Sequence, residues 1–121
     1  MDVPHHRFIA AYVHYGWIGV LVEFGAETKF ATRTPEFRRL STDIATQIAV
    51  MNPVDVGGLL AQTFVKDQAV TVADVLRRAT KELRETIVVR RFVRWAVSEE
   101  PGDDDRELPK NPARVIRFGR R

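Results

Sequence analysis

Residues that commonly carry out chemistry are few in this sequence. The chain contains no cysteine, which excludes disulfide bonds, thiolate metal sites and a cysteine nucleophile. His5 and His6 are adjacent, but no carboxylate lies at metal-ligand spacing, so we predict no metal site there. His14 directly precedes Tyr15-Gly16 and is interpreted as a turn residue rather than as a catalytic base.

Motifs for phosphate binding and for nucleophilic catalysis are also missing. Gly57-Gly58 is not followed by a lysine at the spacing of a phosphate-binding loop, and no G-x-G-x-x-G motif occurs. We interpret this glycine pair as a hinge or a turn. The sequence therefore predicts a protein that is not an enzyme and that has no cofactor.

A basic and aromatic pattern near residue 90 admits a nucleic-acid interpretation. Arg90, Phe92 and Arg94 alternate along a predicted strand, which would place them on one face of it. Arginine and aromatic side chains on one face can contact phosphate groups and stack on bases. RNA contact through a basic face at Arg90 and Arg94 is therefore one alternative.

The elements that must position these residues begin with a predicted β-hairpin. Apolar residues alternate in residues 8–14, Tyr15-Gly16 supplies a turn, and residues 17–25 continue as a second strand. Because the second strand is apolar at most positions, we expect it to be a central strand that is covered on at least one face.

Two helices are predicted from their first residues. Thr34 can cap a helix that has Pro35 at its first position, and the apolar stripe of that helix ends at Asn52-Pro53. Thr71 and Asp74 form a capping-box pattern that starts the second helix. Both helices have one apolar face, so we expect both to pack on a core.

The remaining segments complete an α+β fold. Residues 59–66 form a short apolar stretch, and residues 86–97 are rich in β-branched and aromatic types that favour a strand. The order of the main elements is then two strands, two helices and one strand. We predict a small three-stranded antiparallel sheet with two main helices packed on one side.

Composition favours one domain followed by a charged extension. Residues 1–97 hold the predicted elements, whereas residues 98–121 hold an acidic block from Glu99 to Glu107 and a basic block from Lys110 to Arg121. The four prolines and glycines between Pro101 and Pro112 are typical of a segment without regular structure. No apolar run approaches the roughly 20 residues that span a membrane.

Several segments, in order, resemble the core of translation elongation factor Ts. Residues Ile18 to Phe37 are predicted to form a strand, a short loop and a capped helix start, which is the order of elements in that family. Further similar segments are Phe8 to Glu27, Asp43 to Pro53, Leu60 to Asp67, and Thr86 to Arg94 with its Arg-Arg-Phe-x-Arg strand. In the family this last strand belongs to the core, which disfavours RNA contact.

The resemblance implies a function without bond-making chemistry. Elongation factor Ts binds the GTPase elongation factor Tu and promotes release of GDP, using a Thr-Asp-Phe-Val loop whose aromatic residue wedges into the GTPase domain. Thr28, Lys29, Phe30 and Ala31 match this loop, with Phe30 at the aromatic position. Lys29 replaces the acid and inverts a charge where the family meets its partner, which argues against exchange.

Other partners remain open. Members of the family usually begin with a small helical domain, yet only seven residues precede the first predicted strand here. Longer members also carry an additional helical segment after the first core helix, whereas here residues 54–60 connect the elements directly. A single core copy suits a homodimer or docking to another protein. The alternative function is a structural subunit of a larger assembly, such as an organellar ribosome or a membrane complex. The expected location is the bacterial cytoplasm or the mitochondrial matrix.

Overall fold

The computed structural model describes residues 5–97, so the predicted charged extension at 98–121 lies outside the described residues. The elements in chain order are β1 (His6–His14), β2 (Ile18–Ala26), the 3-10 helix η1 (Ala31–Arg33), α1 (Pro35–Met51), α2 (Val56–Ala61), β3 (Thr63–Phe64), β4 (Asp67–Thr71), α3 (Val72–Leu83) and β5 (Ile87–Ala96).

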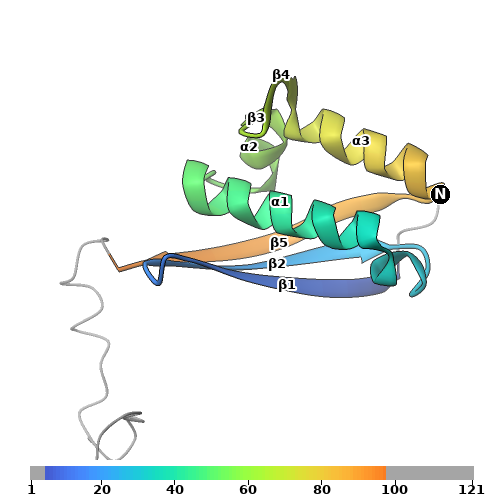
Figure 1. Ribbon diagram of the computed structural model, residues 1–121, viewed down its shortest axis with the longest axis horizontal. Helices are drawn as coiled ribbons and strands as arrows, with labels where there is room; N and C mark the ends of the chain where they lie inside the picture. Colours follow the sequence, from blue (N-terminus) through green and yellow to red (C-terminus); the bar gives the residue numbers. More distant parts are fainter. Residues whose placement is uncertain (1–4, 98–121) are drawn as a thin grey trace, which may run out of the picture.

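A three-stranded antiparallel sheet forms the base of the molecule. Its strand order is β1-β2-β5, so the apolar β2 is the central strand, as the sequence predicts. The helices α1 and α3 lie together on one side of this sheet, and no helix of residues 5–97 lies over the opposite side (Figure 1). This arrangement confirms the predicted α+β fold with two main helices on one side of a small sheet.

The turn between β1 and β2 has the predicted position. His14 pairs with Ile18, and the N–H of Trp17 donates to the carbonyl oxygen of His14 at 2.9 Å. Tyr15 and Gly16 both have positive φ angles, of 54° and 75°. Glycine accepts this conformation without strain, which explains why the hairpin reverses at Tyr15-Gly16.

Both predicted helix starts are confirmed by their caps. The hydroxyl of Thr34 accepts a hydrogen bond from the N–H of Phe37, and Pro35 occupies the first helical position. At α3 the hydroxyl of Thr71 accepts from the N–H of Asp74, while the Asp74 carboxylate accepts from the N–H of Thr71. These bonds satisfy N–H groups that have no partner inside a helix.

The segment between α1 and α3 differs from the prediction. Gly57-Gly58 is not a break: the pair lies in the first turn of α2, where the carboxylate of Asp55 accepts from the N–H of Gly58 at 2.7 Å. The fully buried Leu59 anchors this short helix in the core. A cap and a buried anchor thus outweigh the low helix propensity of two glycines. The small hairpin of β3 and β4 was also not predicted.

The core lies between the helices and the inner face of the sheet. Phe24 of β2 packs edge-on against Phe37 of α1, with ring centroids 5.4 Å apart. One polar side chain, Gln47, is fully buried among these residues. Its amide nitrogen donates to the Thr63 carbonyl oxygen and its amide oxygen accepts from the N–H of Val65, so it ties the β3–β4 hairpin to α1.

Candidate functional site

The loop that follows β2 presents an aromatic side chain to solvent. Phe30 is 75% exposed, whereas the next residue, Ala31, is only 2% exposed and belongs to the core. The loop lies at the end of the molecule where α3 ends and β5 begins (Figure 1). Phe30 therefore does not tuck under its own loop, and the fixed Ala31 beside it limits how far it moves.

A carboxylate from a distant part of the chain holds the first half of this loop. One oxygen of Glu85 accepts from the N–H groups of Glu27 and Thr28, both at 2.8 Å. The other oxygen accepts from the hydroxyl of Thr28, also at 2.8 Å. The Thr28 oxygen in turn accepts from the N–H of Ala31 at 3.2 Å, which closes the turn around Lys29 and Phe30.

A reciprocal bond joins the same two segments. The carboxylate of Glu27 accepts from the N–H of Thr86 at 2.6 Å. This N–H bond holds the pKa of the Glu27 carboxyl below its ordinary value, because it stabilises the charged form. The end of β2 and the start of β5 are thus joined by carboxylate bonds in both directions.

The second half of the loop is held by its own side chains. The carbonyl oxygen of Lys29 accepts from both the N–H and the hydroxyl of Thr32, at 3.2 and 2.7 Å. The hydroxyl of Thr34 donates to the carbonyl oxygen of Ala31 at 2.8 Å. Because the backbone is bonded on both sides of Phe30, little loop entropy is lost when Phe30 contacts a partner.

Thr28, Lys29, Phe30 and Ala31 therefore have different positions in one loop. Thr28 and Ala31 fix the backbone, while Lys29 and Phe30 are exposed at its surface. An exposed aromatic on a rigid loop can fill a pocket of another protein, and such anchors dominate binding energies. Sequence patterns alone could not identify Glu85 in this arrangement, because its bonds span 57 and 58 positions of the chain.

Arg90 and Arg94 do not share a face, contrary to the prediction. The pairing of β2 with β5 shifts between Glu23 and Phe24, which leaves Arg90 as an extra residue beside Glu23 on the face opposite the helices. Arg94 instead reaches α1, where its Nε and Nη2 donate to the carbonyl oxygen of Ala49 at 3.1 and 3.0 Å. Phe92 packs against the core. The bulge thus separates the two arginines.

The sheet face without helices is largely apolar. Three rows of paired residues cross it: Ile9, Glu23 and Arg91; Ala11, Leu21 and Val93; Val13, Gly19 and Trp95. Apolar hollows of about 300 and 250 Å³ lie between these rows. No atom of the described residues lies within 4 Å of the position that a Cβ on Gly19 would occupy. We call this surface the open face. Trp95, which is 77% exposed, forms part of it.

Charge is confined to one end of the open face. Glu23 is 7% exposed and lies 3.1 Å from Arg7, 2.5 Å from Arg91 and 3.6 Å from Arg90. Hydrogen bonds from Arg91, and secondarily from Arg7, lower the pKa of the Glu23 carboxyl. One carboxylate thus meets three guanidinium groups, and this end of the open face is positive.

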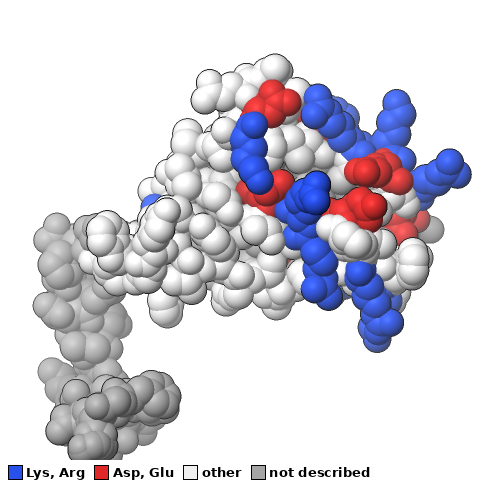
Figure 2. Space-filling view, viewed as in Figure 1, with Lys and Arg blue, Asp and Glu red and all other residues white. Residues whose placement is uncertain are grey.

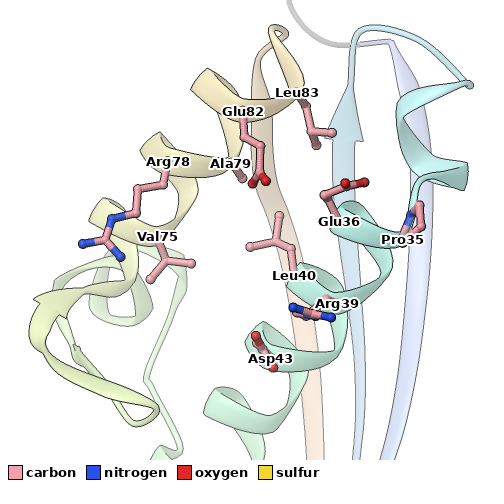
Figure 3. A pocket seen from close by; sticks show the side chains of 10 residues that line it. All are labelled: Pro35, Glu36, Arg39, Leu40, Asp43, Val75, Arg78, Ala79, Glu82 and Leu83. Atoms are coloured by element: carbon pink, nitrogen blue, oxygen red, sulfur yellow. The ribbon is translucent and has the colours of Figure 1, made fainter.

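The helix side of the molecule shows a similar division. Charged side chains gather at the end that holds the Phe30 loop, while the surface toward the β1–β2 turn is almost free of them (Figure 2). A groove of about 350 Å³ separates α1 from α3, with Leu40 and Glu82 reaching into it (Figure 3). None of the residues that line this groove belongs to the Phe30 loop.

Among residues 5–97 we find no group of three or more histidine and carboxylate side chains placed to hold a metal ion. Within the same residues, no helix combines the length and the apolar character of a membrane span.

Comparison with known proteins identifies relatives of the chain. Elongation factor Ts of Methylacidiphilum infernorum is 35% identical, over 76% of this chain and 68% of the relative. Elongation factor Ts of Rubrobacter xylanophilus is 33% identical, over 75% of this chain and 70% of the relative. Elongation factor Ts of a Nostoc species is 34% identical over 72% of this chain, but over only 27% of its own length. A scan against protein-family models finds no match.

The extent of these alignments differs between the relatives. The first two span 137 positions, which exceeds the 121 residues of the chain, so the relatives contain residues there that this chain lacks. The Nostoc alignment spans 87 positions. Identity at this level over most of the chain and of two relatives confirms the resemblance: the chain belongs to the elongation factor Ts family.

Proposed function

We propose that the chain binds elongation factor Tu and promotes release of GDP from it, with Phe30 as the residue that enters the GTPase. The observation that carries this proposal is an exposed aromatic side chain on a loop bonded on both sides, in a member of the elongation factor Ts family. The members of the family named above are bacterial proteins, so we place this activity in the bacterial cytoplasm.

Thermodynamic linkage defines what the loop must do. An exchange factor accelerates release only when it binds the nucleotide-free GTPase more tightly than the GDP-bound form. A side chain that occupies space only available without nucleotide supplies such a difference. Phe30 suits this role because it is apolar, exposed and held by a fixed backbone, so its contact energy is not offset by ordering of the loop.

The test compares GDP release with and without the aromatic ring. Phe30→Ala should lower the rate of labelled GDP release from elongation factor Tu at least tenfold, a loss of about 1.4 kcal/mol of differential binding. Trp17→Ala is the matched control, because Trp17 is an exposed aromatic in the turn between β1 and β2, at the other end of β2 from the Phe30 loop. Equal stimulation by the wild type and Phe30→Ala would remove Phe30 from the mechanism.

Lys29 offers a second test of the same loop. Its side chain is exposed beside Phe30, so a partner that meets the loop also meets this positive charge. Lys29→Asp restores the acid that the family resemblance predicts here and should raise the stimulated rate of GDP release. A lower rate in Lys29→Asp would show that the loop meets a negative surface and docks differently from the family.

The open face favours self-association as a second property. Ile9, Val13, Leu21 and Val93 are exposed apolar side chains on neighbouring strands. Contiguous apolar surfaces of this kind on soluble proteins mark interfaces. We propose that a second copy of the chain stacks its open face on this one, as two sheets do in a sandwich.

Charge selects the orientation of that stack. If the two-fold axis runs parallel to the strands, the cluster of Arg7, Arg90 and Arg91 lies over the same cluster of the second copy. Contact between these like charges would weaken the dimer. If the axis instead runs perpendicular to the strands and passes over Val93, it places Arg91 of one copy over Trp95 of the other. This follows because Arg91 and Trp95 lie two residues before and two residues after Val93 on the same strand. A guanidinium over an indole ring is a favourable contact.

Sedimentation tests self-association. Leu21→Lys puts a charge at the centre of the open face and should convert the wild-type dimer to a monomer. Val54→Lys is the control, because Val54 is the same kind of exposed apolar residue but lies between α1 and α2, away from the sheet. A wild type that sediments as a monomer at high micromolar concentration would contradict the stack. Capture of a stoichiometric set of other subunits with the chain would instead support the assembly alternative.

A further inference from the structure

Glu85 lies outside the loop that matches the family, yet it makes more bonds to that loop than any other side chain among residues 5–97. Three donors converge on its carboxylate: the N–H groups of Glu27 and Thr28 and the hydroxyl of Thr28. All three distances are 2.8 Å. An ionised carboxylate only accepts hydrogen bonds, so three donors without a competing acceptor match its chemistry.

The end of α3 fixes the position of Glu85. Arg84 adopts a left-handed conformation with φ of 61°, which turns the chain sharply after the helix. The N–H of Glu85 then donates to the carbonyl oxygen of Thr80 at 3.2 Å. The backbone of Glu85 is therefore held by α3, while its side chain holds the loop after β2.

A continuous path of bonds leads from Glu85 to Phe30. The hydroxyl of Thr28 donates to Glu85 and accepts from the N–H of Ala31, so Lys29 and Phe30 lie inside a turn closed by that oxygen. Loss of the Glu85 carboxylate releases the Thr28 hydroxyl and two backbone N–H groups together. Ala31 stays in the core, so release acts mainly on residues 27–30.

We propose that Glu85 is a positioning residue that orients Phe30 for contact with elongation factor Tu. The proposal rests on the proposed function, and it extends that function to a residue that the loop motif does not contain. Glu85 acts through the loop and not by touching the GTPase. Its bonds are exposed to solvent, so their effect on the overall free energy of unfolding is small compared with their effect on loop geometry.

The first measurement uses the chain alone. Glu85→Ala removes both carboxylate oxygens, so the N–H groups of Glu27 and Thr28 and the hydroxyl of Thr28 lose their acceptor together. By nuclear magnetic resonance, the N–H groups of Glu27 and Thr28 should exchange with solvent at least tenfold faster in Glu85→Ala. Glu82→Ala, the same change in the last turn of α3, should leave both rates unchanged. Rates within twofold of the wild type in Glu85→Ala would overturn the proposal.

The second measurement is a double-mutant cycle on GDP release. Glu85→Ala should lower the stimulated rate about fivefold in the wild type and have no effect in Phe30→Ala, because a positioning residue then has no aromatic ring left to orient. A fivefold loss in both backgrounds would overturn the path through Phe30. If the wild type fails to stimulate release at all, the proposed function falls, and the amide exchange rates still decide whether Glu85 holds the loop.

Discussion

The two faces of the three-stranded sheet both carry apolar side chains, but within residues 5–97 only one of them is covered. On the inner face, Val22 and Phe24 of β2 are fully buried under α1. On the open face, Leu21 of the same strand and Val93 of β5 remain about half exposed. An antiparallel sheet with one solvated face normally alternates apolar and polar residues, and β2 does not.

This difference separates folding from assembly. The inner face supplies the burial that stabilises a single chain, and its residues are close-packed. The open face contributes little to that stability, and the proposed self-association accounts for its apolar side chains. Substitutions on the two faces should therefore change different measurements.

The largest predicted effect is on the inner face. Phe37→Ala removes a fully buried ring that packs edge-on against Phe8 and Phe24, with centroids 5.1 and 5.4 Å away. It should lower the free energy of unfolding by about 3–5 kcal/mol in urea titrations. Leu21→Ala, measured at concentrations where the chain is monomeric, should cost less than about 1 kcal/mol. Similar losses in the two variants would remove the distinction between the faces.

Two arginines of β5 allow the stability contributions of charged side chains on the two faces to be compared. Arg94 points to the helix side and donates twice to the carbonyl oxygen of Ala49 near the end of α1, so Arg94→Met should cost about 1–3 kcal/mol. Arg91→Met on the open face should cost less, because Arg7 and Arg90 still neutralise Glu23. Thermal unfolding of the two variants at one pH checks the order, and a larger loss in Arg91→Met would reverse it.

A smaller effect should appear as a dependence on pH. The arginines around Glu23 lower the pKa of its carboxyl in the folded chain below the ordinary 4.5, so folding favours the charged form. The resulting stabilisation is fully present above about pH 4.5 and is lost as the pH falls through the lowered folded pKa. Unfolding measured from pH 6 to 3 should be less pH-dependent in Glu23→Gln. An unchanged dependence would show that Glu23 is not stabilised by these arginines.

Local patterns predicted most of the fold. Both main helices were identified from their capping residues, which are Thr34-Pro35 and the pair Thr71 and Asp74. A cap can be recognised in the sequence because its residues are only about three positions apart. Alternation identified the hairpin, and the β-branched and aromatic residues of 86–97 identified the last strand. Gly57-Gly58 was interpreted incorrectly, since only the tertiary contact of Leu59 shows that α2 forms there. The bulge at Arg90 likewise depends on pairing with β2 and has no local signal.

The candidate site was predictable only in part. The family resemblance identified Thr28, Lys29, Phe30 and Ala31, but not that Phe30 is exposed while Ala31 is buried. Local sequence patterns do not indicate the role of Glu85, because its hydrogen bonds join residues that are far apart in the chain. The open face had a signal in β1, where Ile9, Ala11 and Val13 are apolar on the side opposite Phe8. This pattern indicates an exposed apolar face only when it is known which face of the sheet the helices cover.

The affinity of the chain for two forms of elongation factor Tu tests the central claim most directly. Isothermal titration should be carried out with the nucleotide-free GTPase and with its GDP-bound form, at one salt concentration. We predict binding at least tenfold tighter to the nucleotide-free form, with the difference reduced in Phe30→Ala. Equal affinity for the two forms, or no binding to either, would contradict a role in nucleotide exchange.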